Sequence, residues 1–182
     1  MLLPDDGFTP VSRTALLWWS GAFAAFLVYA ALDTDGFLFI DNANLMIHEA
    51  GHMLFGWAGY YTQILGGTLA QVGVPLVCML FFIRRGETTA VAATMFWTFE
   101  NLLYVAFYMA DARRSAIPLV GSDESDWTIL LTHWGLLQRD TAIAAWVRGL
   151  GWIGMLATIA WVAWMHLRQD RVPGSDPGLT PV

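Results

Sequence analysis

Long stretches of apolar residues are the feature that most constrains the fold of this chain. The hydrocarbon core of a bilayer is about 30 Å thick and takes about 20 mostly apolar residues in helical form. Several stretches approach that length between charged or turn-forming residues. The spans that we expect are residues 14–32, 37–61, 68–83, 88–110 and 149–165. The sequence therefore predicts an all-α membrane protein with about five transmembrane helices.

The overall composition agrees with this class and excludes others. Of the 182 residues, 57% are hydrophobic and 13% are charged, whereas about 25% are charged in an ordinary globular domain. The net charge is −6 and the nine cationic residues, all arginine, form no basic patch, which argues against nucleic-acid binding. We expect a multi-pass integral membrane protein of a bacterial-type inner membrane or a plasma membrane, with the lipid bilayer as its partner.

The chain is organised as one membrane domain, residues 1–168, followed by a tail, residues 169–182, that we expect to be disordered. The first span could be a cleaved signal peptide, but Asp5 and Asp6 precede it. Signal peptides begin with net positive charge, so we interpret this span as a retained helix. Residues 127–137 are apolar but too short to cross, which indicates an interfacial or re-entrant helix.

The strongest motif is His48-Glu49-Ala50-Gly51-His52. Residues four apart lie on one face of a helix, so both imidazoles can bind one metal ion. Imidazole is a common zinc ligand, and Glu49 is placed to take a proton from a zinc-bound water as a general base. The alternative is a structural polar cluster. Because ionisable groups inside a membrane segment are costly to bury and are functional candidates by default, we favour a Zn²⁺ site.

The motif and the residues that follow it resemble a known family. The His-Glu-Ala-Gly-His motif, the following Gly66-Gly67-Thr68 and the apolar helix that contains Pro75 resemble the site-2 protease family of intramembrane zinc metalloproteases. In that family the third zinc ligand is an aspartate in a Leu-Asp-Gly-type motif near a later transmembrane helix. Residues 117–121 of this chain occupy a similar place without an aspartate, so the chain resembles a small, divergent member.

The third metal ligand must therefore be sought elsewhere, since a catalytic zinc usually has three protein ligands. We rank Asp126 first, because it follows the loop that stands where the family's aspartate would lie. Asp111 comes next, and His133 and Glu100 follow it. Asp123, Glu124 and Asp140 complete the set of later acidic candidates.

Each candidate ligand also has a structural alternative. Asp126 could cap its own helix, a role worth about 1 kcal/mol, and Asp111 could form a surface ion pair with Arg114. Glu100 could be a protonated acid bonded to a neighbouring helix, and His133 could face the lipid headgroups. Asn44, one turn before His48, could orient an imidazole or simply mark the polar entry of its helix.

Residues 60–68 carry two tyrosines and end near a glycine pair. In the site-2 proteases the matching region forms a membrane-embedded strand, whose exposed edge could bind an unwound substrate by strand addition. A plain connecting loop is the other interpretation.

The function that we expect is intramembrane zinc-dependent proteolysis, with transmembrane proteins as substrates. His48, His52 and Asp126 would bind Zn²⁺, which is the expected cofactor, and Glu49 would activate water. The alternative is a metal-binding membrane scaffold that does not hydrolyse peptide bonds.

Overall fold

The computed structural model describes residues 7–119 and 124–169, and this part of the chain is helical and contains no strand. Two short 3-10 turns, η1 (Gly56–Ala58) and η2 (Leu137–Arg139), interrupt the α-helices. The α-helices are α1 (Arg13–Leu32), α2 (Asp41–Leu54), α3 (Tyr60–Arg85), α4 (Thr88–Ala110), α5 (Asp126–His133) and α6 (Asp140–Gln169).

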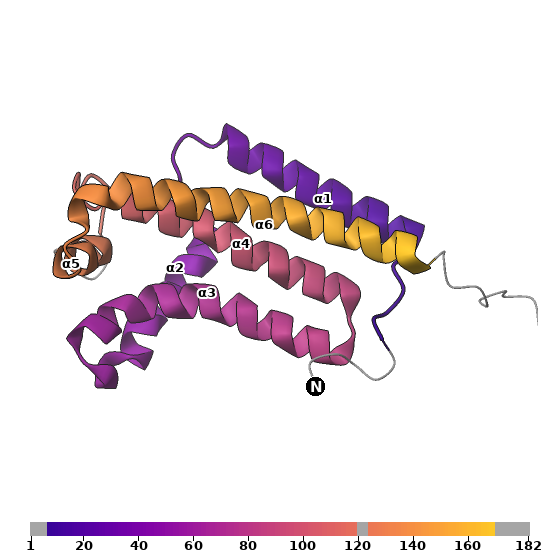
Figure 1. The fold of residues 1–182 in the computed structure, drawn as a ribbon, viewed down its shortest axis with the longest axis horizontal. Coiled ribbons are helices and arrows are strands. Elements are labelled where there is room, and N and C mark those ends of the chain that lie inside the picture. Colours follow the sequence, from indigo (N-terminus) through magenta and orange to yellow (C-terminus); the bar gives the residue numbers. More distant parts are fainter. Residues whose placement is uncertain (1–6, 120–123, 170–182) are drawn as a thin grey trace, which may run out of the picture.

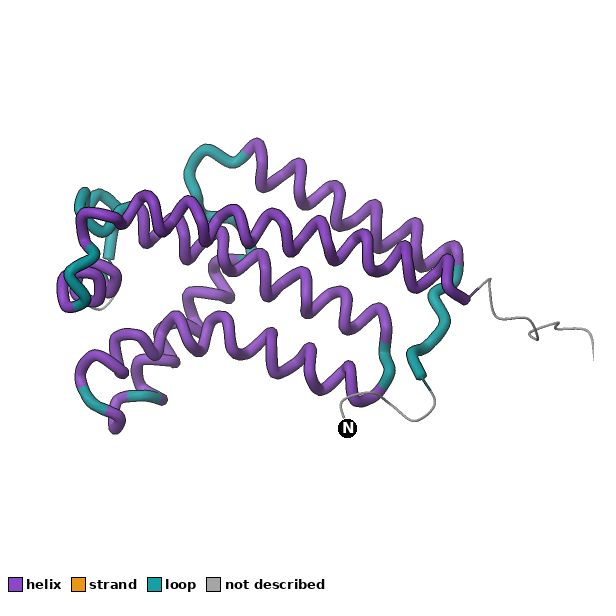
Figure 2. Tube along the Cα trace, in the orientation of Figure 1, coloured by secondary structure: helices purple, strands orange, loops and turns teal. Residues whose placement is uncertain are grey.

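The long helices lie side by side along one axis (Figures 1 and 2). α6 packs along α4, α4 also packs against α3, and α1 lies on the outside against α6. The short helix α2 packs mainly on α3, and α5 lies at one end of the bundle, where it contacts α3 and α4. Both short helices are therefore held by the same pair of long helices.

Among residues 7–119 and 124–169, four helices are long and apolar enough to cross a membrane: α1, α3, α4 and the stretch Leu137–Arg168, which includes nearly all of α6. Large apolar side chains on their outer faces are exposed, as lipid-facing residues would be. Examples are Trp18, Val77, Trp146 and Ile153, each at least 65% exposed. These helices indicate an integral membrane protein.

The expected span at residues 37–61 is not one helix. It divides into α2, which has 14 residues, and the turn η1. The break comes where Gly56 and Gly59 follow each other closely, and Gly59 has φ +97°, a conformation that few other residues adopt. The polar residues of α2 also lower its hydropathy. The described part of the chain therefore contains four candidate spans, and the expected count of about five is not confirmed.

Other expectations also differ from the structure. Residues 60–68 are neither strand nor loop, because they form the first turns of α3. The expected spans at 68–83 and 149–165 lie within the longer helices α3 and α6. The short helix expected at 127–137 is present as α5, which ends at His133. Residues 170–182 of the expected tail lie outside the described residues.

Candidate metal centre

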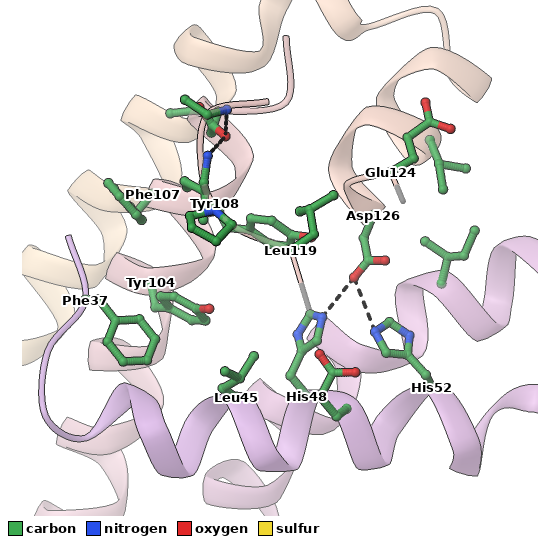
Figure 3. A pocket seen from close by; sticks show the side chains of 18 of the residues that line it. Phe37, Leu45, His48, His52, Tyr104, Phe107, Tyr108, Leu119, Glu124 and Asp126 are labelled. Atoms are coloured by element: carbon green, nitrogen blue, oxygen red, sulfur yellow. Dashed lines mark hydrogen bonds and ion pairs between the residues drawn. The ribbon is translucent and has the colours of Figure 1, made fainter. Parts of the chain in front are cut away.

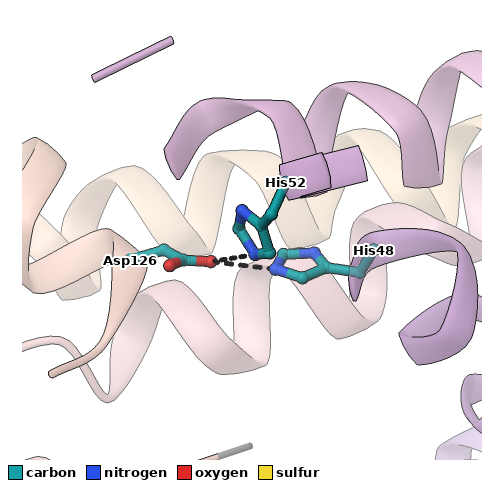
Figure 4. Close-up of side chains that lie close together, drawn as sticks. All are labelled: His48, His52 and Asp126. Carbon is teal, nitrogen blue, oxygen red and sulfur yellow. Dashed lines mark hydrogen bonds and ion pairs between the residues drawn. The ribbon is translucent and has the colours of Figure 1, made fainter. Parts of the chain in front are cut away.

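His48 and His52 lie one turn apart on α2 and point toward the same carboxylate (Figure 4). Their ring centroids are 4.8 Å apart. Oδ2 of Asp126 lies 2.8 Å from Nε2 of His48 and 3.3 Å from Nε2 of His52. One potential ligand atom from each of the three residues lies within 4.8 Å of the others. The helical spacing therefore places both imidazoles on one face, as the motif predicts.

Asp126 is the first residue of α5 and is 8% exposed. The apolar side of the same helix packs on α4, where Leu130 and Leu131 belong to a buried cluster with Val105 and Met109. The Thr128 hydroxyl also donates to the carbonyl of Ala112, just after α4. Asp126 thus does not stand on a free loop, because α5 is anchored to α4.

The second nitrogen of each imidazole faces an oxygen supplied by α3. Nδ1 of His48 is 3.0 Å from Oε1 of Gln71, and Nδ1 of His52 is 3.0 Å from the carbonyl oxygen of Gln63. Both oxygens can only accept, so each Nδ1 must carry the hydrogen. In a neutral imidazole Nε2 then has a free lone pair. When both rings are neutral, two such lone pairs are directed at one carboxylate oxygen of Asp126, and this set of donor atoms suits a cation.

Close packing of α3 against α2 brings these oxygens near the histidines. A Cβ atom on Gly67 would lie 2.5 Å from Nε2 of His48 and 2.7 Å from Cε1 of His52. The same crossing places Gly51 of α2 against Gly66 of α3. Side chains at these positions would separate the two helices, so glycine is needed here for close approach.

The three side chains also interact strongly as acids and bases. The hydrogen bond with Asp126 is the main cause that raises the pKa of His52 to about 9. Burial alone would raise the pKa of Asp126, but its interactions with the His48 and His52 rings outweigh burial and leave that pKa below its ordinary value. Without a metal ion, the site therefore holds a proton on His52 at neutral pH.

A cleft of about 1140 Å³ opens beside the three residues (Figure 3). Glu49 lines this cleft together with His48, His52 and Asp126. On the side of α4, the cleft wall is largely aromatic and includes Tyr104, Phe107 and Tyr108. A carboxylate that can act as a base thus lies in the same cleft as the candidate ligands.

The other predicted ligands lie elsewhere or have other partners. In place of the expected ion pair with Arg114, Oδ2 of Asp111 accepts hydrogen bonds from the backbone nitrogens of Ala116 and Ile117, each at 2.9 Å. His133 is exposed and stacks on Tyr61, with ring centroids 3.6 Å apart. Neither residue belongs to the His48–His52–Asp126 group.

The remaining acidic candidates are also separate from this group. Glu100 is buried on α4 and accepts a hydrogen bond from Asn44, so Asn44 contacts α4 and orients no imidazole. Asp140 pairs with Arg113 at 2.7 Å. Glu124 lines the cleft but is outside the three-residue group, and Asp123 lies outside the described residues.

Sequence reasoning missed Gln71, Gln63 and Gly67. A lone amide in an apolar span was a usable signal for Gln71, which is 1% exposed. Gln63 acts through its backbone carbonyl, which leaves no mark in the sequence. Gly67 was noticed only as part of a glycine pair, since its contact with the histidines depends on helix packing.

The chain matches no family model, no curated protein and no solved structure.

Proposed function

We propose that this chain is an intramembrane zinc metalloprotease in which His48, His52 and Asp126 hold the metal. The observation that supports this best is the orientation of the two imidazoles. Their Nδ1 atoms face oxygens of Gln71 and Gln63, which leaves both Nε2 atoms directed at one carboxylate oxygen. In the metal-free protein this carboxylate holds a proton on His52, and a cation bound by the three residues would replace that proton.

The spacing of the donor atoms suits zinc. Ligand atoms of a tetrahedral zinc lie about 2.0–2.1 Å from the metal and hence about 3.3 Å from each other. The separations from Oδ2 of Asp126 are 2.8 Å to His48 and 3.3 Å to His52. The separation to His52 matches this value, and the separation to His48 would have to widen by about half an ångström. Three protein ligands would leave one position for water, as in catalytic zinc sites.

Zinc in such a site lowers the pKa of water to about 7, which supplies a nucleophile at neutral pH. Glu49 follows the first ligand directly and lines the same cleft. It would accept the proton from the attacking water and deliver it to the leaving amine. His48, His52 and Asp126 would fix the position of the ion, and Gln71 would hold the ring of His48.

The cleft suits a peptide substrate. Its volume of about 1140 Å³ slightly exceeds the range of about 300–1000 Å³ that is common for small-molecule pockets. Aromatic side chains along α4 offer an apolar surface to an unwound segment of a transmembrane or membrane-proximal protein. We place the chain in a bacterial-type inner membrane or a plasma membrane, where such segments are available.

Substitution of the base tests the proposal. Purified wild type, Glu49→Gln and Glu87→Gln would be assayed for metal content and for cleavage of a membrane-embedded reporter. Glu87 is a surface residue that pairs with Arg85, so its substitution is the matched control. We expect about one zinc per chain in all three proteins and at least about a hundredfold slower cleavage in Glu49→Gln alone.

Equal cleavage by wild type and Glu49→Gln would contradict this mechanism. Zinc binding with no cleavage by any of the three proteins would instead favour a metal-binding scaffold. Absence of zinc from the wild type, with zinc offered during purification, would reject the metal site itself.

A further inference from the structure

A second buried polar cluster lies where the beginning of α2 meets the middle of α4. It consists of Asp41 and Asn44 on α2 and Trp97 and Glu100 on α4. Asp41 and Glu100 are each 1% exposed, and Asn44 is fully buried. None of the four belongs to the proposed metal site. Buried acids away from a metal need a partner or a proton.

The side chain of Asn44 joins the two acids. Its Nδ2 donates to Oδ1 of Asp41 at 2.9 Å and to Oε2 of Glu100 at 3.0 Å. Its Oδ1 accepts from the indole nitrogen of Trp97 at 2.8 Å. The single amide group thus uses both of its hydrogens and its oxygen, and it links α2 to α4.

The two acids are not supported equally. Asp41 accepts from Asn44 and also from the backbone nitrogen of Leu38, at 2.7 Å to Oδ2. Glu100 accepts a hydrogen bond from Asn44 at Oε2, and its Oε1 is buried without a hydrogen-bond partner among the described residues. A buried anionic oxygen without a donor is costly. The donors therefore favour the ionised form of Asp41 and the neutral form of Glu100.

The surroundings also disfavour two negative charges. A small cavity of about 90 Å³ borders Asp41, and its charged or titratable lining is Asp33 after α1, Tyr104 on α4 and Arg148 on α6. No described residue of α3 lines it. Asp33 adds a further negative charge and Arg148, which is exposed, offsets it only partly. Two carboxyl groups that share a buried site usually hold one proton between them.

We infer that Asp41 and Glu100 share a single proton, carried by Glu100, and that this pair and Asn44 fix α2 against α4. Most other contacts of α2 are with α3, so this cluster determines how α2 faces α4 and the attached α5. His48 lies one turn beyond Asn44. Asp41, Asn44 and Glu100 are thus positioning residues for the motif helix. Their importance for metal binding rests on the proposed function, whereas the proton and the fixed helix do not.

Infrared spectroscopy tests for the proton without any metal or activity. Wild type at neutral pH should have the carbonyl band of a protonated carboxyl group, and alkaline pH should remove it. Glu100→Gln should lack the band at neutral pH. Glu87→Gln, which alters an exposed carboxylate, should retain it. A wild type without the band, or Glu100→Gln with the same band, would overturn the assignment.

Hydrogen exchange of α2 amides, measured relative to those of α6, tests whether the cluster holds the helix. Glu100→Leu removes the polar link and should raise α2 exchange about tenfold. Glu100→Gln preserves a neutral polar side chain and should stay within about threefold of wild type. Trp97→Phe, a milder change in case the leucine variant does not fold, should give an intermediate increase. Unchanged α2 exchange in Trp97→Phe, or equal exchange in Glu100→Leu and Glu100→Gln, would refute a positioning role.

Discussion

Oε1 of Gln71 lies 3.0 Å from Nδ1 of His48, and both side chains are buried, at 1% and 4% exposure. The other polar atom of this amide, Nε2, is buried and has no hydrogen-bond partner among the described residues. The oxygen of the Gln71 amide therefore accepts a hydrogen bond from His48, whereas its NH₂ group makes no hydrogen bond among the described residues. This difference is expected if the role of Gln71 is to hold the His48 ring through its oxygen.

Substitution of Gln71 by leucine should weaken zinc binding about 10–100-fold, because the ring of His48 loses its orienting acceptor. The Gln71→Glu variant would keep an acceptor and lose no existing hydrogen bond, so its affinity for zinc should remain within about threefold of wild type. Competition with a calibrated chelator measures both values. Similar losses in the two variants would mean that amide packing, and not the acceptor, is what matters.

Gly67→Ala adds only one methyl group, but it should disrupt the metal site strongly. The added Cβ would lie 2.5 Å from Nε2 of His48, so α2 and α3 must separate or both rings must rotate. We expect zinc affinity to fall at least about tenfold. Gly73→Ala on the same helix is the control, since nothing lies within 4 Å of its Cβ. That variant should bind zinc normally and unfold at a slightly higher temperature.

Removal of the third candidate ligand should distinguish it from its rivals. Asp126→Asn should lower zinc affinity by at least about a hundredfold, because a neutral amide is a poor zinc ligand and the site loses its anion. Asp111→Asn and His133→Ala should retain about one zinc per chain. Metal analysis after dialysis compares the three. Normal zinc content in Asp126→Asn, or its loss in Asp111→Asn, would require a different ligand set.

Local and distant parts of this site differed in how well the sequence predicted them. The placement of His48 and His52 depends only on helical periodicity, so the motif was sufficient. Asp126 lies 78 residues beyond His48, and its first rank among the candidate ligands depends mainly on its place after a loop. Neither the strand nor the loop considered for residues 60–68 is present, because the glycine pair lies in α3 at a helix crossing, where small residues allow close approach. Such a contact depends on how two helices pack, so it cannot be predicted from the sequence of either helix alone.

Metal binding should depend on pH through His52. In the metal-free protein its pKa is about 9, so zinc must displace a proton from this ring at any lower pH. Apparent affinity should therefore rise about tenfold per pH unit between about pH 7 and about pH 9, and then level off. Asp126→Asn removes the main cause of the raised pKa, so in that variant the plateau should begin near the ordinary histidine value. An affinity independent of pH in the wild type would contradict this linkage.

The stability of the metal-free protein should fall as the pH rises, whereas its apparent affinity for zinc should increase. His52 has a higher pKa in the folded chain, about 9, than the ordinary 6.5. Its protonation therefore stabilises the fold fully below about pH 6.5, and this contribution disappears as the pH rises through about 9. Thermal unfolding of the metal-free wild type should thus shift to lower temperature between about pH 7 and about pH 10, whereas His52→Gln should lack this component. With zinc bound at Nε2 the His52 ring is already neutral and keeps only its Nδ1 hydrogen, so the loaded wild type should also lack this component. A metal-free wild type whose decline matches that of His52→Gln would mean that His52 and Asp126 do not form this ion pair.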